Sequence, residues 1–120
     1  MKLEKFEDIE SWKLSRELVK KIYAIKSIEK DYGLKDQIRR ASVSIMSNIS
    51  EGFDSGSNKS FILFLNYSYR SASEVQSLLY VCKDLFYVTE QEFKKLFEEV
   101  TNIKNLLGGF IKYLKNNKRK

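Results

Sequence analysis

The segment at residues 89–114, TEQEFKKLFEEVTNIKNLLGGFIKYL, decides the fold class. It begins with a capping box, in which a threonine at the N-cap and a glutamate three residues later bond each other's backbone amides. Its apolar side chains then recur every three or four residues, which is the spacing of one face of a helix. They are Phe93, Leu96, Phe97, Val100, Ile103, Leu107, Phe110, Ile111 and Leu114. The segment therefore predicts an amphipathic helix over residues 90–113 that packs against other elements.

Two helices with the same apolar spacing are expected in the first half of the chain. The first spans residues 9–28, and Asp8 is suited to be its N-cap. A turn signal, EKDYG, follows it. The second helix spans residues 34–51 and is expected to stop at Gly52, because glycine is the usual residue just past a helix C-terminus.

A third helix is expected over residues 58–86, with Ser57 or Asn58 as its cap. Short connections make neighbouring helices antiparallel. We therefore predict an all-α protein, an antiparallel up-down-up-down four-helix bundle that forms one domain over residues 1–120. Gly108-Gly109 does not fit this scheme, because glycine weakens a helix interior. A local kink or the close approach of another chain would explain the pair.

The composition excludes several classes of protein. The chain has no proline and five glycines, which argues against turn-rich β folds. It has no histidine, so it lacks the commonest general base and metal ligand, and its one cysteine cannot form an internal disulfide. We expect no enzyme activity, no metal and no cofactor. The N-terminus lacks the apolar core of a signal peptide, and a lone cysteine suits a reducing compartment, so a cytoplasmic location is expected.

Positive charge is concentrated at the C-terminus. The net charge is +6, and residues 112–120 carry five positive charges and no acid, which leaves +1 for the other 111 residues. The five are Lys112, Lys115, Lys118, Arg119 and Lys120. Such a tail suits a phosphate backbone or an anionic surface. A solvated terminus that aids solubility is the alternative.

The expected third helix is too apolar for a helix with one solvent-facing side. Only Arg70 and Glu74 are charged between residues 60 and 81. Apolar and aromatic side chains occupy the core face and also the opposite face. The second face carries Ile62, Tyr69, Ser73, Gln76, Tyr80 and Tyr87, with Tyr67 beside them. We interpret this face, and Tyr69, Gln76 and Tyr80 in particular, as a homo-oligomer interface. Stacking of the tyrosines on nucleic-acid bases and ordinary surface scatter remain open.

A polar seam borders the apolar face of the expected second helix. On a helical wheel Gln37, Ser44, Asn48 and Glu51 lie together. Arg70 and Glu74, four residues apart, share a face of the third helix. We predict a structural hydrogen-bonded network that joins the two groups and sets helix register. An active site on Glu51 and Glu74 is the weaker interpretation, because no second carboxylate pair or histidine completes a di-metal site.

The second helix also carries a sequence signature. Residues 36–45, DQIRRASVSI, continue to NISEG at residues 48–52. This pattern resembles that of small bacterial proteins encoded in intervening sequences of 23S ribosomal RNA genes, sometimes called S23 ribosomal proteins. Further matches are Ile9 and Trp12, then Lys59, Phe61, Phe64 and Leu65, then Ser71 and Glu74, and the turn at residues 85–92. Met46 and Ser50 depart mildly from the family pattern.

The resemblance implies an antiparallel four-helix bundle that assembles into a ring-like homo-pentamer with no known enzymatic activity. It also implies a distant relation to the accessory protein of diversity-generating retroelements, a basic pentamer that binds nucleic acid and a reverse transcriptase. One functional hypothesis is therefore a homo-oligomer that binds RNA through the tail, with Arg39 and Arg40 as secondary contacts. The alternative is a protein-interaction scaffold with no nucleic-acid role. Neither hypothesis includes a membrane or a small-molecule substrate.

Overall fold

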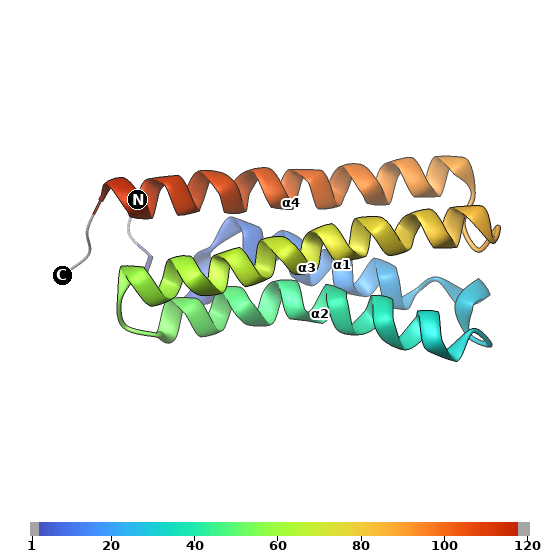
Figure 1. Cartoon of the computed structure of the whole chain (residues 1–120), viewed down its shortest axis with the longest axis horizontal. Coiled ribbons are helices and arrows are strands. Elements are labelled where there is room, and N and C mark those ends of the chain that lie inside the picture. The colour runs from blue at the N-terminus through green and yellow to red at the C-terminus, as the bar shows by residue number, and fades with distance from the viewer. Residues whose placement is uncertain (1–2, 118–120) are drawn as a thin grey trace.

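The computed structural model describes residues 3–117 and contains four α-helices. They are α1 (Glu10–Tyr23), α2 (Tyr32–Asp54), α3 (Asn58–Asp84) and α4 (Glu90–Asn116). Short 3₁₀ turns at Phe6–Asp8 (η1) and Lys26–Ile28 (η2) flank α1. Successive helices run in opposite directions, and the described residues contain no strand (Figure 1). The predicted all-α antiparallel four-helix bundle is confirmed.

Each helix lies beside two others, in the pairs α1–α2, α2–α3, α3–α4 and α1–α4. Leucine, isoleucine, valine and phenylalanine side chains from all four helices fill one continuous core between them. α1 has 14 residues, whereas α3 and α4 have 27 each. At 1.5 Å per residue α1 is about half as long as α3 and α4. Leu3 and Phe6 of the segment that precedes α1 are partly buried and pack against the core.

The start and end of α1 differ from the expectation. Asp8 does not cap the helix, because its carboxylate closes η1 by accepting the backbone N–H groups of Glu4 and Lys5. The N-cap is Ile9, which has no side-chain capping bond. The helix ends at Tyr23 instead of residue 28, because the backbone is extended at Ile25. Ile28 belongs to the following 3₁₀ turn, η2, and its side chain is buried in the core. The apolar pattern therefore continues beyond the end of the α-helix.

The predicted helix stop at Gly52 is wrong. α2 begins at Tyr32, capped by Asp31, and continues through Gly52 to Asp54. A Cβ atom on Gly52 would lie 2.8 Å from Cδ1 of Phe61 and 2.8 Å from Cβ of Phe64. The glycine therefore lets α2 and α3 approach each other closely. Within the α2–α3 turn, the residue that adopts a positive φ is Gly56, four residues further on.

The boundaries of α3 and α4 follow their caps. Ser57 accepts the N–H of Ser60 at the start of α3, and the Thr89 capping box with Glu92 begins α4, as predicted. α3 ends at Asp84, two residues early, because Phe86 has a φ of 63°. α4 runs without interruption through Gly108-Gly109, and a Cβ on either glycine would meet no atom within 4 Å.

Candidate functional site

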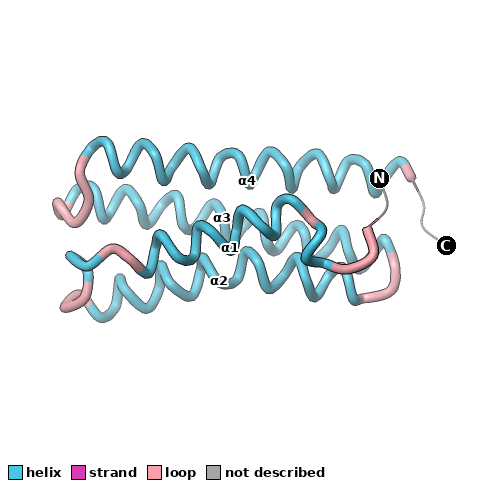
Figure 2. Tube along the Cα trace, turned by 180° about the vertical axis from the view of Figure 1, so that it is seen from behind, coloured by secondary structure: helices cyan, strands magenta, loops and turns pink. Residues whose placement is uncertain are grey.

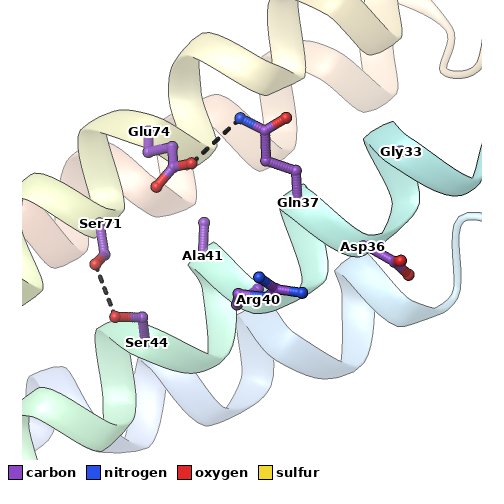
Figure 3. Close-up of a pocket in the computed structure, with 8 residues that line it drawn as sticks. All are labelled: Gly33, Asp36, Gln37, Arg40, Ala41, Ser44, Ser71 and Glu74. Atoms are coloured by element: carbon purple, nitrogen blue, oxygen red, sulfur yellow. Dashed lines mark hydrogen bonds between the residues drawn. The ribbon is translucent and has the colours of Figure 1, made fainter.

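A polar groove lies between α2 and α3. It has a volume of about 400 Å³. Its lining is polar or small on both helices: Gly33, Asp36, Gln37, Arg40, Ala41 and Ser44 from α2, and Ser71 and Glu74 from α3 (Figure 3). The α2 residues come from two adjacent rows of one helix, in which positions recur at three- and four-residue intervals. Helical periodicity therefore collects these side chains on one side of α2.

Hydrogen bonds join the two walls of the groove. Gln37 Nε2 donates to Glu74 Oε2 at 3.4 Å, and Ser71 Oγ donates to Ser44 Oγ at 2.9 Å (Figure 3). Asn48 Nδ2 donates to the same Ser44 hydroxyl at 2.9 Å. These bonds fix the register of α2 against α3 and satisfy the polar groups that α2 directs towards its neighbour.

The sequence-predicted seam is divided in the structure. Gln37 pairs with Glu74, and Asn48 pairs with Ser44, but the two contacts are separate. Glu51 is exposed and makes no hydrogen bond or ion pair with any residue of the described range 3–117. It lies 14 residues beyond Gln37 on α2, or about 21 Å along the axis, so Glu51 and Glu74 do not share a site.

Arg70 also lies outside these contacts. Its guanidinium is exposed and lies over the Tyr67 ring, 5.4 Å from the centroid. The serines that complete the α2–α3 contact were missed in the sequence. They are Ser71 and the buried Ser68, whose Oγ donates to the Ile45 carbonyl at 2.7 Å. Their three-residue spacing on α3, opposite the small residues of α2, is the signal that could have indicated them.

Arg39 and Arg40 occupy different environments. Arg39 faces the end of α1 and the α1–α2 connection: its guanidinium lies over the Tyr23 ring at 4.6 Å, and its Nη2 lies 2.7 Å from Oε1 of Glu29, just after η2. The hydrogen bond from Arg39 lowers the pKa of Glu29, and the positive charges of Arg39 and Lys35 lower it further. Arg40 is exposed at the edge of the polar groove. Arg39 is thus engaged within the chain, whereas Arg40 is accessible.

The basic C-terminal residues are only partly within the described structure. Lys112 and Lys115 are exposed on the last turns of α4. Lys118, Arg119 and Lys120 lie outside the described residues. At the other end of α4, Lys94 and Lys95 form a second exposed pair.

The interface residues predicted on α3 also separate into two groups. Tyr69 and Tyr80 are exposed, and the Tyr80 ring packs on Phe93 at 4.9 Å. Gln76 is buried: its Nε2 donates to Thr101 Oγ1 at 2.8 Å, and its Oε1 accepts Lys104 Nζ at 3.1 Å. Gln76 therefore joins α3 to α4 inside the chain.

An exposed apolar surface nevertheless runs along α3. We call it the α3 surface; its members are Leu63, Tyr67, Tyr69, Tyr80 and Val81, each between 38% and 49% exposed. Leu63, Tyr67 and Val81 were not among the sequence-predicted interface residues. They lie in one outward-facing row of α3 that also contains Arg70 and Glu74. Tyr67, Arg70, Glu74 and Val81 follow Leu63 by four, seven, eleven and eighteen residues, and each of these intervals returns to the same side of a helix.

The chemistry of the remaining groups is limited. Burial raises the pKa of the Cys82 thiol to about 11, with a further contribution from the negative charge of Asp31. A thiol with that pKa is protonated at neutral pH and is a poor nucleophile. No group of three possible metal-ligating side chains occurs within residues 3–117. No helix in the described part of the chain is long and apolar enough to cross a bilayer.

Comparisons with known proteins agree with the sequence signature. A family model described as "23S rRNA-intervening sequence protein" matches residues 7–109. A crystal structure of a protein of unknown function from the S23 ribosomal protein family of Bacteroides thetaiotaomicron is similar to this chain, with a TM-score of 0.78 and 26% sequence identity. The match covers 85% of this chain and 98% of that one. A search of curated proteins found no match.

Proposed function

We propose, from the premise that this chain belongs to the family of 23S rRNA intervening sequence proteins, that it is a non-catalytic subunit of a homo-oligomer, with five subunits as the expected number. In this proposal the assembled subunits bind RNA through phosphate contacts that do not depend on sequence. The observation that carries the proposal is the α3 surface, because its row of Leu63, Tyr67 and Val81 leaves large side chains exposed along one side of α3.

The aromatic content of that surface suits a subunit contact. A stable interface buries about 800 Å² on each partner, and aromatic residues are enriched at the centre of such interfaces. The α3 surface contains three tyrosines, and a cation lies over each ring: Arg70 over Tyr67, Lys104 over Tyr69 and Lys83 over Tyr80. A contact through these rings must keep the cations paired or in water, because burying an unpaired charge is costly.

A non-catalytic role is supported by the polar groove. Its Gln37, Ser44, Ser71 and Glu74 side chains are hydrogen-bonded to one another across the helices. Residues bonded in this way serve packing and register, as the polar network of a bundle core often does. The carboxylates of Glu51 and Glu74, the pair that the sequence offered as a catalytic alternative, are far apart along the bundle and cannot act on one substrate together.

RNA binding is supported by charge alone. Five subunits would carry five times the chain's net charge of +6, and each would contribute Lys112 and Lys115 as exposed cations on α4. Arg39 is no longer a candidate contact, because Glu29 neutralises it. Several weak basic sites on one assembly bind a polyanion with higher avidity than one site alone.

Light scattering tests the assembly. The wild-type protein is expected to have a mass several times 14.1 kDa at micromolar concentration. Substituting Leu63→Glu together with Tyr67→Glu is expected to reduce the mass towards one chain, because it introduces charge into the α3 surface. The matched control is Leu14→Glu, a comparably exposed leucine on α1, which is expected to leave the mass unchanged. A wild-type mass of 14.1 kDa would refute the oligomer.

A titration with structured RNA at two salt concentrations tests the ligand. Binding through phosphates weakens steeply with salt, by about 0.7 to 0.9 in the log–log slope per phosphate neutralised. The pair Lys112→Gln and Lys115→Gln is expected to reduce that slope and the affinity for every RNA alike. Lys94→Gln with Lys95→Gln is the control of equal charge. Salt-independent RNA binding, or none, would favour the protein-interaction scaffold.

A further inference from the structure

A second cavity lies in the seam between α1 and α4. It has a volume of about 310 Å³, and most of its wall is apolar. It is lined by Leu3, Ile9, Glu10, Ser11, Leu106, Phe110 and Tyr113. These residues come from the N-terminal segment, the first turn of α1 and the last third of α4, which meet at one end of the bundle (Figure 2). The cavity is distinct from the polar groove and from the α3 surface.

One polar side chain in the cavity wall has no partner. Ser11 is 2% exposed, and its Oγ makes no hydrogen bond to any described residue. The other three buried serines of residues 3–117 each donate to a carbonyl, at distances of 2.6 to 2.9 Å: Ser15 to Ser11, Ser42 to Arg39, and Ser68 to Ile45. Buried hydroxyls are nearly always hydrogen-bonded, so the Ser11 hydroxyl requires a partner that residues 3–117 do not supply.

The charges around the cavity restrict what that partner can be. No lysine or arginine lines it, and its one charged residue is the carboxylate of Glu10. Phosphates, nucleotides and fatty-acid carboxylates are therefore disfavoured, because each would bring a negative charge beside Glu10 with no cation to balance it. The apolar wall favours an uncharged carbon skeleton that carries one hydroxyl or N–H group.

The volume restricts the size of the ligand. A cavity of about 150 Å³ lined by apolar side chains accommodates benzene. The α1–α4 cavity is about twice as large, which suits two fused rings, and it reaches the lower limit of volumes typical of small-molecule sites. Phe110 in its wall offers an aromatic surface for ring contacts.

We propose that the α1–α4 cavity binds a small neutral bicyclic aromatic compound whose single hydroxyl or N–H group hydrogen-bonds to Ser11 Oγ. This site does not depend on the proposed assembly or on RNA. The ring system replaces water against Leu106 and Phe110. The Ser11 Oγ atom is enclosed in this structure, so its side chain turns to another χ1 rotamer, towards the cavity, to bond the polar group of the ligand.

Two probes of the same shape separate the hydrogen bond from the apolar contact. They are 2-naphthol and 2-methylnaphthalene, which differ by a hydroxyl in place of a methyl group. Fluorescence anisotropy of each probe is expected to show binding to the wild-type chain, with 2-naphthol bound about 3- to 10-fold more tightly, the range given by one hydrogen bond. Failure of both probes to bind at millimolar protein would overturn the proposal.

Variants assign the preference to Ser11. Ser11→Ala is expected to bind both probes equally, and its Tm is expected to be unchanged or higher, since an unpaired buried hydroxyl is removed. Ser15→Ala, the matched control one turn further on α1, should retain the preference for 2-naphthol. Retention of the full preference in Ser11→Ala would show that the hydroxyl binds elsewhere and would refute the site.

A second pair of variants tests the location. Leu106 is partly exposed, so Leu106→Trp is expected to fill the cavity and abolish binding of both probes without unfolding α4. Leu85→Trp, at an exposed leucine outside the cavity, should bind as the wild type does. If Leu106→Trp instead changes the mass of the protein and the wild type binds neither probe, a second copy of the chain occupies the cavity and the proposal is wrong.

Discussion

The two turns at opposite ends of α3 each place one residue in the left-handed backbone conformation, but the residue is different in each turn. The α2–α3 and α3–α4 turns lie at opposite ends of the bundle (Figure 1). The α2–α3 turn places Gly56 at a φ of 91°, whereas the α3–α4 turn places Phe86 at a φ of 63°. Glycine has no Cβ and adopts this left-handed region freely, but a phenylalanine is strained in it. Phe86 is also 90% exposed, so its ring gains nothing from the core. The comparison shows that a tightly bonded frame can impose the left-handed conformation without glycine.

Different bonds hold the two turns. In the α3–α4 turn, Tyr87 N donates to Cys82 O at 2.8 Å and Phe86 N donates to Lys83 O at 3.1 Å, the pair of bonds that defines a Schellman motif. The Tyr87 hydroxyl then donates to Asp31 at 3.0 Å and ties the turn to the start of α2. The α2–α3 turn relies on serines, since Ser55 Oγ bonds the Gly52 carbonyl at 2.6 Å.

The largest expected effect is at the glycine-dependent end. Gly52→Ala places a methyl group 2.8 Å from Phe61 and Phe64, so α2 and α3 must separate, at a cost of about 1–3 kcal/mol. Urea unfolding measures the loss. Gly33→Ala is the control in the same helix, where a Cβ meets no atom and helix propensity predicts a gain of up to about 1 kcal/mol. Equal stability of the two variants would contradict the packing role of Gly52.

The next effect concerns the left-handed glycine itself. Gly56→Ala leaves the space around the residue open but forces a Cβ into the left-handed region, which costs about 1–2 kcal/mol. Thermal unfolding is expected to show a lower Tm. No change in Tm would mean that the α2–α3 turn can adopt another conformation, and the contrast with Phe86 would then disappear.

In the α3–α4 turn, glycine is expected to raise the free energy of unfolding. Phe86→Gly relieves the strain but increases the entropy of the unfolded chain, so a net gain of about 0.5–1 kcal/mol is expected. Phe86→Ala retains a Cβ in the left-handed region and serves as the control, with little gain. A loss of stability in Phe86→Gly would show that the exposed ring contributes contacts that outweigh its strain.

The smallest and most selective effect is on pH dependence. The hydrogen bond to Asp31 is the main cause of the raised pKa of Tyr87. A raised folded-state pKa means that the neutral phenol stabilises the fold below its unfolded pKa of about 10, and that this contribution is lost as the pH rises through the higher folded value. Unfolding free energies measured from pH 8 to 12 should therefore fall less in Tyr87→Phe than in the wild type. Cys82 is present in both proteins, so its own titration cancels in the comparison except for its electrostatic coupling to Tyr87.

Local signals in the sequence predicted local structure well. The Thr89 capping box and the apolar stripe after it placed the start of α4 at Glu90, and its end within three residues of Asn116. Gly52 shows where such reasoning fails. A glycine near the end of a helical pattern reads as a stop, but its actual role depends on the phenylalanines of another helix. In the same way Ile25 and Ile28 continued the apolar period of α1 beyond the end of the α-helix.

The candidate site was predictable to the extent that helical periodicity determines it. Gln37, Ser44 and Asn48 share a side of α2 by spacing alone; Gln37 and Ser44 do bond side chains of α3, whereas Asn48 bonds Ser44 of its own helix. Which side chains meet across a helix pair depends on the rotation of each helix about its axis, which no single sequence reveals. On α3, a small difference in angle about the helix axis separates the buried Gln76 from the exposed Tyr69. On α2, the rotation of the helix about its axis directs Arg39 towards Glu29.

The short α1 has a consequence for the order in which the bundle opens. Its contact with α4 is the smallest of the four helix pairs, and the α1–α4 cavity lies in that seam. The longer α2, α3 and α4 can stay paired while α1 detaches, because neither the α2–α3 nor the α3–α4 contact passes through α1. Backbone amides of α1 are therefore expected to exchange with deuterium through a partial opening, ahead of those in the middle of α3, which exchange only when the whole bundle unfolds.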